Sequence, residues 1–193
     1  ICKKIGIDVY EVMKGVGYDH RINPYFLNAG LGFGGSCFPK DVMALIRLAE
    51  KNGEEPALLK SVIDVNEQQP GRITQILQAR IGDIRGKKIT VLGLAFKDNT
   101  DDVRDSRSIP VIEELLAQGA LISAFDPMAT ESMKKVFPDI IYHTNAGNAL
   151  EGKPGGRAAS PFAVFHGPDQ GGAHGPDRGG LFHVVPGALA HGP

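Results

Sequence analysis

The sequence predicts an α/β protein in which a helical region precedes the beginning of a parallel sheet. Two observations support this fold class. Up to about residue 85, apolar side chains recur at the spacing of amphipathic helices, whereas residues 86–151 alternate short apolar runs with helical segments. A third stretch, residues 152–193, differs from both in composition. We therefore expect three parts, at 1–85, 86–151 and 152–193.

After an apparent helix over Ile1–Ile5, four helices are predicted in residues 6–85. Asp8 and Glu11 fit a capping box for the first, which we expect Gly15 to end. The other three carry an apolar stripe bounded by proline or glycine. They are expected from Pro39 to Gly53, from Pro56 to Pro70 and from Pro70 to Ile81. One side of the third predicted helix carries Leu59, Val62, Ile63 and Asn66.

The periodicity changes at Gly86. Residues 89–96 form a short apolar run rich in β-forming side chains, which predicts a buried strand. Because a strand, a helix and a second strand in this order lie parallel in one sheet, this region should begin a parallel sheet. The expected elements after the first strand are a loop over 97–107, a helix over 108–118, a strand over 121–125, a helix near 131–137 and a strand at 140–142.

The last 42 residues have an unusual composition. Residues 152–193 contain eleven glycines and six prolines, and His-Gly-Pro recurs at 166, 174 and 191. Such a segment buries too little apolar surface to offset the entropy lost on ordering. We expect this tail to be disordered or foreign to the fold, for example through a frame change near Lys153. Metal binding by its histidines is the alternative, although no carboxylate or cysteine recurs at ligand spacing.

Charge and composition argue against several classes of protein. The formal net charge is -1, so no overall basic field favours a nucleic acid or an anionic membrane as partner. The apolar stretches fall short of the roughly 20 residues that a membrane span needs, and we expect a cytoplasmic protein. Cys2 and Cys37 lie in unrelated contexts without ligand spacing, which predicts neither a disulfide framework nor a metal site.

The strongest local signal is the segment Gly32–Asp41, which follows a glycine-rich loop. Its glycines permit close approach of the backbone to a ligand, and a helix beginning at Pro39 would direct peptide N–H groups toward Cys37. A thiol at a helix N-terminus ionises more readily and attacks carbonyl carbons. Asp41, one helical turn later, would position water. A glycine-rich turn around a buried cysteine is the alternative interpretation.

This segment carries a resemblance to a known family. Together with Arg21-Ile22 and Phe26-Leu27-Asn28, the run Gly-Phe-Gly-Gly-Ser-Cys-Phe-Pro-Lys-Asp resembles the active-site segment of the UDP-glucose dehydrogenase family. A second run, Gly93–Ser106 followed by Phe125-Asp126-Pro127, is similar to the start of that family's UDP-binding domain. The resemblance extends over residues 1–151.

The resemblance implies both a fold and a reaction. Residues 1–85 would form a helical central region through which a homodimer assembles, and residues 86–151 a partial Rossmann-like UDP-binding domain. The reaction would oxidise C6 of UDP-glucose from an alcohol to a carboxylate with two NAD molecules. Cys37 would form a thiohemiacetal and then a thioester with the substrate, and Asp41 would assist hydrolysis of the thioester.

The resemblance also implies contacts with ligands. Arg21 would reach the sugar nucleotide across the dimer interface, and Arg104 would contact the cofactor. The remaining implied contacts to the nucleotide sugar are Phe26, Asn28, Gly34, Phe96 and Lys97.

The sequence departs from the family pattern in one important respect. No Gly-x-Gly-x-x-Gly follows an early strand, and the family's catalytic lysine and asparagine have no counterpart before Cys37. Because Ile1 already lies in an apparent helix, we expect a fragment that lacks the NAD-binding domain and is inactive by itself. The alternatives are a dehydrogenase for GDP-mannose or a UDP-N-acetylhexosamine, a non-catalytic UDP-binding module, and a helical dimerisation remnant.

Overall fold

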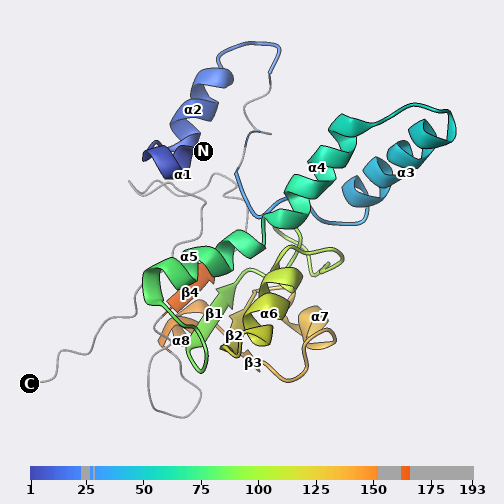
Figure 1. The fold of residues 1–193 in the computed structure, drawn as a ribbon. Coiled ribbons are helices and arrows are strands. Elements are labelled where there is room, and N and C mark those ends of the chain that lie inside the picture. Colours follow the sequence, from blue (N-terminus) through green and yellow to red (C-terminus); the bar gives the residue numbers. More distant parts are fainter. Residues whose placement is uncertain (23–26, 28, 152–161, 166–193) are drawn as a thin grey trace, which may run out of the picture.

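The helical part of the molecule comes first in the chain. A computed structural model describes residues 1–22, 27, 29–151 and 162–165. In Figure 1 the third and fourth helices lie side by side as a hairpin that projects away from the sheet, and the fifth returns to it. The helices of this part are α1 (Cys2–Ile5), α2 (Val9–Val16), α3 (Phe38–Lys51), α4 (Ala57–Gln68) and α5 (Gly71–Ile81).

The second part is a parallel sheet with helices packed on it (Figure 1). The strand order is β3-β2-β1-β4, and each neighbouring pair is parallel, which confirms the predicted α/β class. The elements are β1 (Lys88–Leu92), α6 (Ser108–Ala117), β2 (Leu121–Phe125), α7 (Thr130–Lys134), β3 (Ile141–Tyr142), α8 (Ala146–Glu151) and β4 (Phe162–Phe165).

Side chains of the two central strands alternate between two faces of the sheet. On one face, Ile89 and Val91 of β1 join the main apolar cluster, to which α5, α6 and α7 also contribute. On the other face, the Thr90 hydroxyl bonds the Ser123 hydroxyl at 2.9 Å and donates to the Ala149 carbonyl of α8 at 3.1 Å. Helix α5, although it belongs to the predicted helical region, therefore shares the core of the sheet.

The predicted ends of the helices are partly confirmed. Asp8 caps α2, because its carboxylate accepts from the Tyr10 amide at 2.9 Å. The prediction that Gly15 ends this helix was wrong, since α2 continues to Val16; one glycine weakens a helix without necessarily stopping it. Pro70 separates α4 from α5 as predicted.

Two predicted elements are shorter in the structure, and one helix was not predicted. The strand expected over 89–96 ends at Leu92, because Gly93 has a φ of 90° and the chain then turns toward Asp126. The helix expected near 131–137 spans Thr130–Lys134. Helix α8 was not predicted, since its six residues carry no strong apolar period.

Four residues of the predicted tail form β4, which pairs with β1 from Ile89 to Leu92. The sequence did not predict this strand, because the surrounding glycine and proline outweigh a four-residue apolar run in any average of composition. The rest of the predicted tail lies outside the described residues. Among the residues that the structure describes, no helix is both long enough and apolar enough to cross a membrane.

Candidate active site

Cys37 lies at the N-terminus of α3. It is the residue immediately before the helix, one position closer than the prediction placed it, and its side chain is exposed. The Asp41 amide donates to the Cys37 carbonyl at 2.8 Å, so the intervening turn is helical and Asp41 follows Cys37 by one turn. The first N–H groups of α3 therefore lie at the cysteine end of the helix. In the single chain the thiol is exposed, in contrast to the buried cysteine of the alternative interpretation.

The glycine-rich loop before Cys37 is held by contacts from distant parts of the chain. The Phe33 amide donates to Asn66 Oδ1 at 2.7 Å, and Asn66 Nδ2 donates to the Phe33 carbonyl at 3.0 Å. The Gly35 amide donates to the Arg104 carbonyl at 3.1 Å. These bonds join the loop to α4 on one side and to the loop after β1 on the other.

Two glycines permit this close approach. A Cβ at Gly34 would lie 2.1 Å from the Asp105 carbonyl oxygen, and one at Gly35 would lie 2.6 Å from the Phe96 ring. Gly35 also has a φ of 83°, which side chains other than glycine rarely adopt. The two segments that carry the family resemblance are therefore in direct contact, although some sixty residues separate them along the chain.

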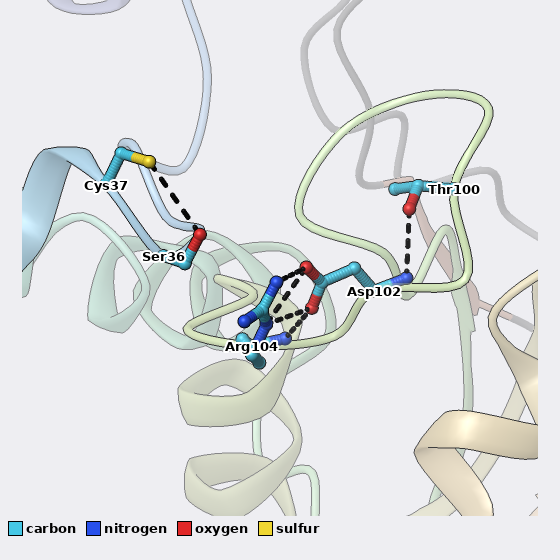
Figure 2. A network of polar contacts seen from close by, with 5 residues as sticks. All are labelled: Ser36, Cys37, Thr100, Asp102 and Arg104. Carbon is cyan, nitrogen blue, oxygen red and sulfur yellow. Dashed lines mark hydrogen bonds and ion pairs between the residues drawn. The ribbon is translucent and has the colours of Figure 1, made fainter.

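A charged pair dominates the loop after β1. Arg104 donates to both carboxylate oxygens of Asp102, with Nη2 to Oδ2 at 2.6 Å and Nε to each oxygen at 3.0 Å (Figure 2). Hydrogen bonds from Arg104, together with its charge and that of Lys97, lower the pKa of Asp102 to about 2. The Asp102 amide donates to Thr100 Oγ1 at 3.2 Å, which fixes the turn that presents the pair.

Figure 2 shows this pair in the same view as the cysteine end of α3. The Ser36 hydroxyl lies 3.8 Å from Cys37 Sγ, within reach of a weak hydrogen bond. Hydrogen bonds and charge from Asp102 raise the pKa of Arg104, and the charge of an ionised Cys37 acts in the same direction. The basic group within the motif, Lys40, instead has its ammonium 3.4 Å from Asp41.

The other predicted site residues lie outside these contacts. Lys97 is exposed, with its ammonium 5.3 Å from the centroid of the Phe96 ring. Arg21 is exposed and donates to both carboxylate oxygens of Asp19, at 2.9 and 2.5 Å. Phe26 and Asn28 lie outside the described residues. The structure therefore brings together Cys37, Gly34, Phe96 and Arg104, and leaves Arg21 beside Asp19.

Asp126 occupies the turn where a dinucleotide-binding fold would hold a ribose. Its side chain is buried, and its oxygens accept from the amides of Leu94, Ala95, Met128 and Ala129 at 2.7 to 3.3 Å. Burial alone would raise the pKa of Asp126, but these donors lower it below its ordinary value. Because the carboxylate and these four N–H groups already satisfy each other, this turn does not fit a dinucleotide.

Two further features of the described residues bear on the site. No group of three or more histidine, cysteine, aspartate or glutamate side chains among them is arranged to hold a metal ion. A groove of about 520 Å³ lies where α4, α5 and α6 meet, and its lining includes Glu67, Arg72 and Glu114 but none of the predicted site residues.

Sequence reasoning missed two residues that shape the site. Asn66 is only 4% exposed, and Arg107 is buried and donates to the Asn66 carbonyl at 3.1 Å. A signal for Asn66 existed, because a carboxamide stood on the same side of the predicted helix as Leu59 and Ile63. No pattern in the sequence marked Arg107.

The family of the chain emerges from comparisons with known proteins. Residues 1–68 match the central domain, and residues 90–153 the UDP binding domain, of the UDP-glucose/GDP-mannose dehydrogenase family. The chain is 51% identical over 150 residues to the UDP-glucose 6-dehydrogenase AglM of Haloferax volcanii and 44% identical over 153 residues to YwqF of Bacillus subtilis, also a UDP-glucose 6-dehydrogenase. These alignments cover 78% and 79% of this chain but 35% of each relative, so the chain spans about a third of their length.

Solved structures agree with the sequence matches. A UDP-glucose dehydrogenase from Pyrobaculum islandicum superposes with a TM-score of 0.79 at 42% identity, covering 85% of this chain and 37% of that one. A GDP-mannose dehydrogenase from Pseudomonas aeruginosa gives 0.65 at 26% identity, covering 88% and 39%. The fold and the cysteine loop are thus those of a class of oxidoreductases, the nucleotide-sugar dehydrogenases. Within that class, the chain belongs to the UDP-glucose/GDP-mannose dehydrogenase family, as the sequence predicted.

Proposed function

We propose that this chain is the catalytic-cysteine and UDP-binding part of an NAD-dependent UDP-glucose 6-dehydrogenase. One observation carries the proposal: the cysteine loop and the loop after β1 are in contact through Gly35, Phe96 and Arg104. A nucleotide sugar held by the second loop would therefore have its sugar near the thiol of the first. The names of the relatives favour UDP-glucose over other nucleotide sugars.

In this proposal Cys37 is the nucleophile. Its thiolate adds to a C6 aldehyde to give a thiohemiacetal, and water later hydrolyses the corresponding thioester to the carboxylate. Asp41, which is exposed one turn along α3, would orient that water. The oxidation between these steps needs a hydride acceptor, which in a dehydrogenase of this family we take to be NAD. The described residues do not form a dinucleotide cradle.

The remaining assignments follow the family resemblance. Phe96 and Lys97 would contact the nucleotide sugar from the loop after β1, and Arg104 would contact the cofactor. Arg21 would act across a dimer interface, which is compatible with its exposure in a single chain. The roles of Phe26, Asn28 and Gly34 around the sugar, and a cytoplasmic location, stay predictions.

Calorimetric titration of the chain with UDP-glucose tests the proposal. We expect binding that weakens about tenfold, or about 1.4 kcal/mol, in Lys97→Ala, because a cation near the ligand phosphates is lost. Lys60→Ala on α4 is the matched control, since Lys60 pairs with Glu50 and Glu55 and should leave the affinity unchanged. Cys37→Ala should also bind, because the thiol acts only after binding.

Two outcomes of these assays contradict the proposal. Tighter binding of GDP-mannose or a UDP-N-acetylhexosamine than of UDP-glucose would reassign the substrate. Absence of binding to UDP-glucose and to UDP alike would remove the nucleotide-sugar site. We expect no NADH from the chain with UDP-glucose and NAD, and turnover that depends on Cys37 would show that a cofactor site is present after all.

We also propose that the chain forms a homodimer through α3 and α4. Several apolar side chains on these helices are exposed in the single chain, and a second copy would bury them. They are Phe38, Met43, Leu45, Leu48, Leu58, Val62 and Val65. Sedimentation velocity should show a dimer that Leu45→Glu with Leu48→Glu converts to a monomer. Leu116→Glu on α6, also exposed in the single chain, is the control that should leave the dimer intact.

A further inference from the structure

We propose that Asn66 is a positioning residue for Cys37, because its carboxamide fixes the backbone of the loop over residues 32–37. This inference rests on the proposed function, since the placement of the thiol matters for chemistry only if Cys37 is the nucleophile. Among the described residues, the side-chain hydrogen bonds of Asn66 go to Phe33 and not to the thiol or to a proposed ligand contact. It acts through the backbone of Phe33.

The Asn66 side chain pairs with the Phe33 backbone as a neighbouring strand would, through one accepted and one donated hydrogen bond. Its Oδ1 accepts from the Phe33 amide at 2.7 Å, and its Nδ2 donates to the Phe33 carbonyl at 3.0 Å. A planar carboxamide offers an acceptor and a donor side by side, which a carboxylate or a hydroxyl does not. Since Asn66 is 4% exposed, water has little access to replace these bonds.

The loop is shaped to receive this side chain. Gly32 has a φ of 104°, and a Cβ there would lie 2.3 Å from Asn66 Oδ1. Any larger residue at position 32 would displace the carboxamide or the loop. The glycine that starts the motif is therefore required by Asn66, which lies on a different element of the structure.

The backbone of Asn66 is itself held by a residue of the proposed UDP-binding part. Arg107, at the start of α6, donates to the Asn66 carbonyl at 3.1 Å and to the Glu67 carboxylate at 3.1 Å. Its side chain is 8% exposed. A cation at this place satisfies carbonyls at the C-terminal end of α4. The end of α4 is thus fixed to the segment that carries Phe96 and Arg104. The bonds from Asn66 to Phe33 in turn fix the cysteine loop to the end of α4.

A spectroscopic reporter on Cys37 tests this inference in the full chain. With Cys2 replaced by serine, Cys37 is the single thiol and can be alkylated with a trifluoromethyl reagent. We expect one sharp fluorine resonance in the parent, and loss of that single resonance through broadening or splitting in Asn66→Ala. Asn66→Asp should do the same, because a carboxylate of equal shape cannot donate to the Phe33 carbonyl. Ser61→Ala is the control on the same helix and should keep the parent resonance, since the Ser61 hydroxyl donates to the Ala57 carbonyl of its own helix.

The outcomes separate this inference from the proposed function. A spectrum of Asn66→Ala identical to that of the parent, with the fold intact by circular dichroism, overturns the positioning role. If Asn66→Ala does not fold, the isosteric Asn66→Asp decides by the same criterion. Addition of UDP-glucose is read separately: a parent resonance that does not move argues against the nucleotide-sugar site, while the comparison between parent and Asn66 variants still stands.

Discussion

Both the helical and the sheet parts of this chain contain amphipathic helices, but these helices are buried to different extents. Among the described residues up to 70, only Leu31, Gly35, Ile46, Asn66 and Pro70 are buried. By contrast, α5, the last helix of the helical part, and α6 cover the strands, and residues such as Leu77 and Leu115 are fully buried. An apolar stripe predicts that a helix will pack, but not against what. The helices around the sheet pack within the chain, whereas α3 and α4 leave much of their apolar stripe exposed in the single chain.

The largest effect should come from a cavity in the sheet part. Leu115→Ala on α6 removes a fully buried side chain and should lower the free energy of unfolding by about 2–5 kcal/mol. Leu48→Ala on α3 is the same substitution at a side chain that is 57% exposed. It should change the free energy of unfolding of the monomer by less than about 0.5 kcal/mol. Urea denaturation at low protein concentration measures both. Equal losses would break the contrast between the two parts.

A smaller effect is expected where the two parts meet. Gly35→Ala places a methyl against the Phe96 ring at a backbone conformation that disfavours it, and should lower the free energy of unfolding by about 1–3 kcal/mol. Gly30→Ala, with no atom of the described residues within 4 Å of its Cβ position, should change the free energy of unfolding by less than about 0.5 kcal/mol. The same denaturation assay applies. Tolerance of alanine at 35 would mean that the loop and Phe96 are not in contact in solution.

The next effect, the contribution of Asp126 to the stability of the sheet part, depends on pH. Asp126→Asn keeps an acceptor but loses bonds from the amides of Leu94 and Ala95, and should lower the free energy of unfolding by about 1–2 kcal/mol at pH 7. The pKa of Asp126 is lower in the folded chain than its unfolded value of about 3.9, so its contribution is complete above that value. It is lost as the pH falls through the folded pKa. The gap between parent and variant should therefore shrink below about pH 4.

The smallest effect should come from the surface of the helical part. Lys60 on α4 lies 2.7 Å from Glu50 and 2.9 Å from Glu55, and both carboxylates raise its pKa. Because these groups are exposed, water and salt screen them, and Lys60→Gln should leave the urea midpoint within experimental error. A clear loss at low salt that disappears at high salt would show that this surface is more ordered than its exposure suggests.

Local signals predicted much of this molecule. The helix after Cys37, the break at Pro70 and the strand over 121–125 depend on residues close in sequence, and all three are present. The contact between the cysteine loop and Phe96 could be expected only through the family resemblance. The roles of Asn66 and Asp126 could not be derived, because each bonds backbone groups more than thirty residues away. A sequence pattern identifies a buried polar residue, but it does not identify the backbone that the residue satisfies.

The position of β1 in the sheet has a consequence for the order of assembly. This strand is central, with β2 on one side and β4 on the other. Its partner β2 begins some thirty residues later, but β4 begins more than seventy residues later. A contact of such long sequence separation forms late, because a larger loop must close first. During synthesis the central strand therefore emerges with one open edge, which stays available to other strands until residues 162–165 have left the ribosome.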